Sequence, residues 1–204
     1  MRRAGRLTPG LWMTRKLAQS RQFVAMIALG RKRLLRLLLA GIVAAFVLFC
    51  AANARLFIWP TSGMPAHVDA IVMLAGPGDR PKTALRLASE RRAPFLVVSR
   101  GFNGYGGPCP APVPPVKLIC FEPSPASTRG EAEFAGRLAR RYHWHSVTLV
   151  TSTVQDSRAR QRMQHCFAGH VYVVTVGLPR YSWPTQIAYE WAATIKMVAW
   201  QRGC

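Results

Sequence analysis

Residues 68–78 read VDAIVMLAGPG, and this stretch decides the fold of the 204-residue chain. An almost unbroken apolar run is typical of a strand that is buried on both faces, as in a parallel sheet. The small residues that close the stretch, Gly76, Pro77 and Gly78, predict a tight turn directly after that strand. The stretch therefore predicts the first strand and turn of an α/β domain.

Outward from this stretch, apolar strands alternate with segments of helical spacing. The further predicted strands are 94–98, 147–150 and 171–176, and the predicted helices are 80–92, 128–142, 156–167 and 184–200. Residues 102–127, rich in Gly and Pro, are predicted to form a long loop. This alternation favours a mostly parallel sheet with helices on both faces, a Rossmann-like three-layer sandwich of the α/β class.

The first third of the chain has a different composition. Residues 1–68 hold 11 Lys and Arg and no acid, whereas residues 69–204 hold 17 basic and 8 acidic residues. Residues 37–54 carry no charge, and as a helix they would span roughly 27 Å, close to the hydrocarbon thickness of a bilayer. We expect a basic cytoplasmic tail at 1–36, a transmembrane helix at 37–58, a linker at 59–67 and an extracytoplasmic α/β domain at 68–204.

The flanking charges predict the orientation of the apolar segment. Ten Lys and Arg precede it and Arg55 follows it, so the positive-inside rule places the N-terminus in the cytoplasm and the C-terminal domain outside. The net charge of +20 makes nucleic acid a partner to consider. The basic tail lacks interleaved aromatic residues and adjoins a membrane segment, so the membrane is the expected partner and nucleic acid is not.

Two alternatives also keep the domain outside. Ala52-Asn53-Ala54 fits the A-x-A pattern of a signal-peptidase site, so the segment is either a retained anchor or a cleaved signal. A lipid anchor on Cys50 is less favoured, because Phe49 is not the small residue that such a site requires. The sequence leaves the choice between anchor and signal open.

The remaining cysteines suit an oxidising compartment. Cys109 and Cys120 bracket a Pro-rich loop, and we predict a disulfide between them, which would contribute about 3 kcal/mol in the chain-entropy model. Cys166 and Cys204 are left as a second possible pair. The alternative for each pair is two free thiols.

The predicted topology nominates one binding site. Ligands of open α/β sheets bind beyond the carboxyl ends of the strands, and the segments there supply small residues, hydroxyl groups, helix N-termini and arginines. Such a set suits an anionic or phosphate-containing ligand, while no cofactor is assigned. The predicted ligand-binding residues are Gly76, Gly78, Asp79, Arg80, Ser99, Gly101, Thr128, Glu131, Ser152, Gln155 and Arg158.

Several of these residues have simpler structural interpretations. Glu131 stands three residues after Thr128, the spacing of a capping box, so helix capping is the alternative to a role in the site. Arg158 and Arg162 share a helix face, for which exposure to solvent is the default. The sequence contains no G-x-S-x-G motif, and its histidines are not spaced as metal ligands, so neither a serine hydrolase nor a metal site is expected.

The ordered set of motifs resembles the YdcF-like family. The resemblance covers 68–178 and rests on Asp69 to Leu74 with Gly76 and Arg80, Ser99 with Gly101, Thr128 with Ala132, and Thr151-Ser152 with Arg158-Ala159. Glu190 is similar to a late acidic position of the family. The resemblance implies a Rossmann-like fold, an N-terminal span and a role in bacterial envelope integrity and peptidoglycan precursors. The chain departs from the family at Gln155, where a His is usual, and an amide cannot act as a general base.

These features predict a membrane-anchored extracytoplasmic protein of the cell envelope that binds an anionic ligand at the strand ends. One alternative is an enzyme acting on a phosphate-containing envelope precursor, with Glu131 or Asp79 as its acid or base. Another is a non-catalytic interaction protein that uses the disulfide-held loop. The sequence does not decide among the three.

Overall fold

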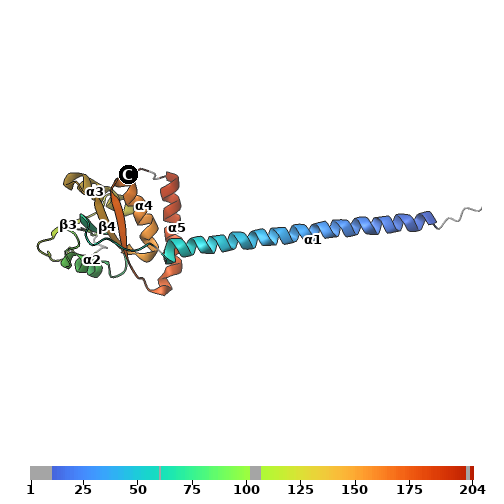
Figure 1. The fold of residues 1–204 in the computed structure, drawn as a ribbon, viewed down its shortest axis with the longest axis horizontal. Helices are drawn as coiled ribbons and strands as arrows, with labels where there is room; N and C mark the ends of the chain where they lie inside the picture. Colours follow the sequence, from blue (N-terminus) through green and yellow to red (C-terminus); the bar gives the residue numbers. More distant parts are fainter. Residues whose placement is uncertain (1–10, 60, 102–106, 201–202) are drawn as a thin grey trace, which may run out of the picture. The chain divides into compact units, whose positions relative to one another are not determined.

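The computed structural model describes residues 11–59, 61–101, 107–200 and 203–204 (Figure 1). The chain divides into two units, Met1–Ala51 and Ala52–Cys204. The described part of the first unit belongs to one helix, α1 (Leu11–Asn53), which continues into a short π-helix at Ala54–Ile58. Residues 1–10 of the predicted basic tail lie outside the described residues.

The stretch Arg31–Ile58 is long and apolar enough to cross a membrane by length and composition. Its large apolar side chains, among them Leu37, Ile42 and Leu48, are exposed rather than packed against protein. A helix with these properties near the N-terminus fits either a membrane anchor or a signal sequence, the two alternatives that the sequence predicts.

The second unit is built on one sheet whose strands all run parallel. Strands β1 to β5 are Ala70–Met73, Phe95–Ser99, Lys117–Phe121, Ser146–Ser152 and His170–Val176. Their order in the sheet is β3-β2-β1-β4-β5, which places β1 at the centre. All residues of β1 are buried, and this explains why its sequence is apolar without alternation. The predicted α/β fold with a parallel sheet is confirmed.

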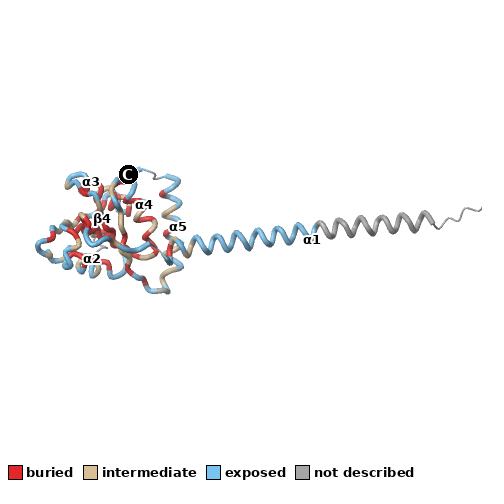
Figure 2. The backbone as a smooth tube through the Cα atoms, viewed as in Figure 1, coloured by how far each residue is buried: buried red, intermediate tan, exposed pale blue. Residues whose placement is uncertain are grey.

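Helices cover both faces of the sheet (Figure 1). The helices of this unit are α2 (Arg80–Ser89), α3 (Thr128–Tyr142), α4 (Asp156–Cys166) and α5 (Trp183–Trp200). Ile71 and Met73 of β1 pack in one apolar cluster with α2, and Ala70 and Val72 pack in a second cluster with α3 and α4. Figure 2 shows the buried residues gathered between these layers.

The first residues of the second unit pack into its core. Phe57 is 4% exposed and forms an apolar cluster with Val154 and Leu178. Asn53 Oδ1 accepts a hydrogen bond of 2.9 Å from Trp191 Nε1 of α5. The segment Ala52–Ile58, the end of the candidate span, is therefore part of the folded body of this unit.

The segment predicted to be a long loop contains a strand, so that prediction was wrong. β3 occupies Lys117–Phe121 and, among the described strands, pairs with β2 and no other. Residues 102–106 lie outside the described residues. The strand is short and directly follows PAPVPPV. Prolines of that density are unusual beside a central strand but are tolerated at a sheet edge, where β3 lies.

The described domain contains two disulfides. Cys109 and Cys120 are bonded, as predicted, and the bond ties the Pro-rich loop to β3. Cys166 and Cys204 are also bonded, which links the end of α4 to the residue after α5. Cys50 is the free cysteine and is exposed.

Candidate functional site

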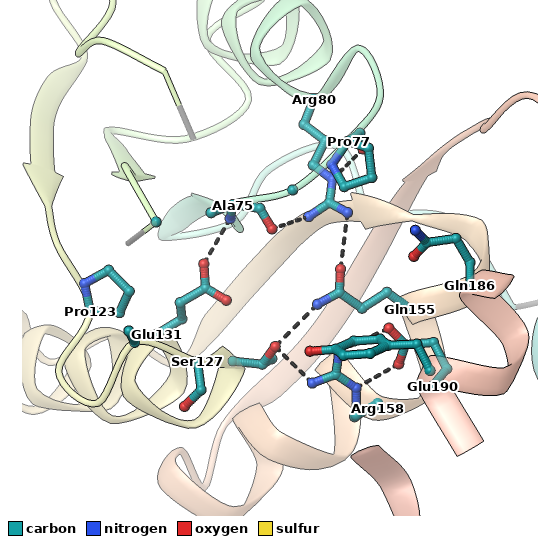
Figure 3. Close-up of a pocket in the computed structure, with 15 residues that line it drawn as sticks. Ala75, Pro77, Arg80, Pro123, Ser127, Glu131, Gln155, Arg158, Gln186 and Glu190 are labelled. Atoms are coloured by element: carbon teal, nitrogen blue, oxygen red, sulfur yellow. Dashed lines mark hydrogen bonds and ion pairs between the residues drawn. The ribbon is translucent and has the colours of Figure 1, made fainter. Parts of the chain in front are cut away.

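A cavity of about 510 Å³ borders the carboxyl ends of β1 and β4. The chain order in the sheet reverses at this point, since β2 lies on one side of β1 and β4 on the other. Both the position and the volume are typical of a small-ligand site in an α/β fold. The lining residues, drawn in Figure 3, are Ala75, Gly76, Pro77, Arg80, Gly101, Pro123, Ala126, Ser127, Thr128, Glu131, Gln155, Arg158, Gln186, Tyr189 and Glu190.

Arg80 organises one wall of this cavity. Its side chain is buried and donates five hydrogen bonds, to the carbonyl oxygens of Leu74, Ala75 and Pro77 and to Ser152 Oγ and Gln155 Oε1. A guanidinium has five N–H donors, so each of them is already used by the protein. A ligand would therefore meet Arg80 as a fixed positive charge rather than as a hydrogen-bond donor.

The turn after β1 fits closely around the Arg80 guanidinium. Gly76 has a φ of +139°, and a Cβ there would lie 2.7 to 2.9 Å from three guanidinium atoms of Arg80. Both the backbone conformation and the contact exclude a side chain, so glycine is required at this position. Gly76 thus makes room for Arg80 as well as lining the cavity.

Gln155 and Thr128 continue the hydrogen-bond network. Gln155 Oε1 accepts bonds from Arg80 and from Thr151 Oγ1, and its Nε2 donates to Thr128 Oγ1 at 3.1 Å. Thr128 Oγ1 also accepts a bond of 2.8 Å from Arg158 Nη1. A hydroxyl has two lone pairs and one proton. Because both described partners donate to Thr128, its own proton is left to donate to a ligand in the cavity.

Arg158 and Glu190 form a nearly buried pair across the cavity. Arg158 Nε and Nη2 donate to the two carboxylate oxygens of Glu190 at 2.5 and 2.9 Å. Burial acts to lower the pKa of Arg158, but the hydrogen bonds and charge of Glu190 outweigh it and raise the pKa. The bonds to Glu190 and Thr128 use three of the five donors of Arg158 within the described residues, so two remain for a ligand.

Glu131 is the buried acid of the cavity. Its Oε1 accepts a hydrogen bond of 2.7 Å from the backbone N–H of Ala75. Burial raises the pKa of Glu131, and the opposing hydrogen bonds from Ser99 and Ala75 and the charge of Arg80 only reduce that effect. The carboxyl group of Glu131 is therefore easier to protonate than that of an exposed glutamic acid.

Glu131 does not cap α3. The helix begins after Ser127, whose side chain makes no capping hydrogen bond, and the Glu131 carboxylate reaches across to the end of β1 instead. The capping-box alternative is thus excluded. Ser127 and Thr128 line the cavity, so the N-terminus of α3 borders it. Helix N-termini carry backbone N–H groups without intrahelical partners and the positive end of the helix dipole.

The charges that line the cavity nearly balance. Arg80 and Arg158 are cationic, and Glu131 and Glu190 are acidic. With Glu131 ionised the formal charges cancel, and with Glu131 protonated they leave one positive charge. Protonation of Glu131 and binding of an anion therefore favour each other.

The structure places the predicted site residues in three settings. Gly76, Arg80, Gly101, Thr128, Glu131, Gln155 and Arg158 line the cavity. Ser99 and Ser152 are buried behind it, where they hydrogen bond to Glu131 and Arg80 respectively. Gly78, with a φ of +98°, and Asp79 lie in the exposed turn before α2, outside the cavity lining.

Sequence reasoning missed most of the contribution of α5, and its default interpretation left two arginines of α4 exposed to solvent. Gln186 and Tyr189 line the cavity, although only Glu190 was singled out in that helix, through the family resemblance. A lone acid in an otherwise apolar helix was the available signal. Arg162, expected on a solvated helix face with Arg158, is 4% exposed, so that expectation was wrong for both.

Comparisons with known proteins return no match. No protein-family model, no curated protein and no solved structure matches this chain. Among the described residues, no group of three or more His, Cys, Asp or Glu side chains is placed to hold a metal ion. Function is therefore inferred from the cavity residues themselves.

Proposed function

We propose that this chain is a membrane-anchored extracytoplasmic protein that binds a small anionic, phosphate-containing ligand of cell envelope biogenesis. The binding body would be a Rossmann-like sandwich of the YdcF-like kind. Its N-terminus would lie in the cytoplasm and its α/β domain outside. The membrane, through the candidate span Arg31–Ile58, and the phosphate-bearing small molecule or envelope precursor are the proposed partners.

The observation that carries the proposal is the set of unused donors around the cavity. Thr128 and Arg158 have three such donors between them, and the first turn of α3 adds backbone N–H groups. Arg80 adds a fixed charge. Donors fixed beforehand by a protein network bind an anion without a large cost of ordering.

The disulfides support the proposed location. Two disulfides in one domain suit an oxidising, extracytoplasmic compartment. The surplus of Lys and Arg before the candidate span supports a cytoplasmic N-terminus. Both observations favour a domain that works on the outer side of the membrane.

Calorimetric titration of the full chain in detergent micelles with phenyl phosphate tests the proposal. The double variant Arg158→Met/Glu190→Leu removes the buried pair together, which leaves no unpaired buried charge. We expect it to bind phenyl phosphate at least about tenfold more weakly than the wild type, the loss expected for a strong charge-assisted contact. The matched control, Arg86→Met/Glu90→Leu, removes an exposed pair at the C-terminal end of α2 and should bind like the wild type.

Two outcomes would contradict the proposal. Equal affinity in the Arg158 double variant would show that the anion binds elsewhere. No binding by the wild type would favour the third alternative, an interaction protein that uses the disulfide-held loop.

An enzyme acting on a phosphate-containing envelope precursor is the second candidate, and Glu131 favours it. A buried carboxyl group with a raised pKa beside an anion site has the properties of a general acid. Asp79, the other acid suggested by the sequence, lies outside the cavity lining. Release of nitrophenol from p-nitrophenyl phosphate and bis(p-nitrophenyl) phosphate by the wild type but not by Glu131→Gln, with binding retained, would establish turnover. Binding without release would limit the protein to ligand capture.

A further inference from the structure

Helix α5 presents an apolar face to solvent. Glu190 and Met197 are buried toward the body of the domain, whereas much of the remaining helix is exposed (Figure 2). Ile195 is 56% exposed and Trp200 is 78% exposed. The exposed positions of the helix are Pro184, Thr185, Ala188, Tyr189, Ala192, Ile195, Lys196, Val198, Ala199 and Trp200, with Lys196 as their one charged side chain.

This face adjoins the end of the candidate membrane span. Trp191 donates its indole N–H to Asn53 Oδ1 and packs against Phe57 with ring centroids 5.8 Å apart. Asn53 and Phe57 belong to the same unit as α5 and form the last two turns of Arg31–Ile58. Trp191 neighbours Ala188 and Ile195 along the helix surface, since residues three and four apart lie side by side. The exposed apolar face thus starts where the span ends.

We propose that the exposed face of α5 docks on the surface of the lipid bilayer, in the headgroup region. The proposal rests on the retained anchor of the proposed function. A helix with apolar and aromatic residues on one face and few charges there is suited to this depth, and Trp and Tyr are the side chains enriched at it. Arg55 and Lys196, both exposed, are placed to meet anionic headgroups.

Docking would also place the cavity at the membrane. Tyr189 is 61% exposed on α5, lines the cavity and lies with its ring 5.7 Å from the Arg158 guanidinium carbon. One side chain therefore belongs both to the apolar face and to the anion site. Lipid headgroups would then lie next to the opening through which a ligand enters.

Quenching of tryptophan fluorescence by brominated lipid tests the docking. The full chain is incorporated, one copy per nanodisc, into phosphatidylcholine and phosphatidylglycerol with or without bromine near the ester linkage. We expect Trp200→Phe to lose a quenchable component of up to about one sixth of the emission, because the chain has six tryptophans. Trp144→Phe, which removes a buried indole from the apolar cluster with α3 and α4, should lose none.

A charge variant sharpens this test. Ile195→Glu should abolish quenching of Trp200 while the chain stays in the nanodisc, and Gln161→Glu, at an exposed position of α4, should leave it unchanged. Absence of Trp200 quenching in the wild type would overturn the docking. Quenching of Trp200 that appears only with two copies per nanodisc would overturn it as well. Binding of phenyl phosphate would persist in that event, so failure of the docking is separable from failure of the proposed function.

Discussion

A hollow lies at the carboxyl ends of the strands, here called the carboxyl edge of the sheet, and another at their amino ends, the amino edge. The two hollows differ in the charge and burial of the side chains that line them. The carboxyl edge has the cavity of about 510 Å³ with four charged side chains around it. The amino edge of β4 and β5 has a hollow of about 830 Å³ lined by Trp144 and by exposed histidines, among them His143, His165 and His170. The larger hollow contains no network of buried, hydrogen-bonded charges within the described residues. Its polar side chains are solvated.

This difference shows that buried charged groups, rather than the volume of a cavity, indicate a ligand-binding site. Taking ionised groups out of water costs free energy unless other groups compensate for it. Arg80, Glu131, Arg158 and Glu190 are buried at the carboxyl edge, and hydrogen bonds and opposite charges there offset the cost of burying them. Exposed histidines at the other edge carry no such cost and indicate no such role.

The largest expected effect comes from Arg80. Replacing it by Met leaves three carbonyl oxygens, Ser152 and Gln155 without their donor, and should lower the free energy of unfolding by about 3–5 kcal/mol. Arg86→Met on the exposed side of α2 should change it by less than about 0.5 kcal/mol. Urea denaturation of the full chain in micelles measures both. Equal losses would show that the network at the carboxyl edge contributes no special stability.

A smaller loss in the free energy of unfolding is expected when a side chain is placed against the Arg80 guanidinium. Gly76→Ala places a Cβ against Arg80 at a positive φ, and we expect a cost of about 2 kcal/mol. Gly177→Ala is the matched control, because a Cβ at Gly177 meets no heavy atom within 4 Å. A neutral Gly76→Ala variant would contradict the tight fit described for the turn after β1.

The pH dependence of stability tests Glu131. The pKa of Glu131 is raised in the folded state, so the folded protein binds this proton more tightly than the unfolded chain does. The stability that this proton contributes is fully present below pH about 4.5 and is lost as the pH rises through the folded pKa. Relative to Glu131→Gln, the wild type should therefore lose stability as the pH rises through the folded pKa of Glu131. Asp156, whose pKa burial also raises, is present in both proteins and cancels. Parallel stability curves from pH 4 to 8 would refute the raised pKa.

The smallest effect is expected at the amino edge. His165→Ala removes an exposed side chain from the larger hollow and should change the free energy of unfolding by less than about 0.5 kcal/mol. It should also leave the affinity for phenyl phosphate unchanged. Weaker binding in this variant would reverse the assignment of the two edges.

Sequence patterns predicted the parts of the fold that depend on local spacing. The unbroken apolar run of β1 and the bounds of α3 follow from such spacing, and the loop cysteines identified one disulfide. β3 was missed because five residues at a sheet edge after several prolines carry little periodic signal. The cavity contacts of α5 were missed because they join residues more than thirty positions apart, as in Arg158 with Glu190. The same holds for Glu131, whose burial depends on the end of β1 and could not be read from the helix that carries it.

The most direct measurement is a map of backbone amide chemical shifts of the full chain, recorded while phenyl phosphate is added. Binding at the carboxyl edge predicts the largest changes at the first amides of α3, Thr128 to Gly130, with no change at Gly169 and His170 at the amino edge. Changes confined to the amino edge, or none at the start of α3, would contradict an anion site among the buried charges.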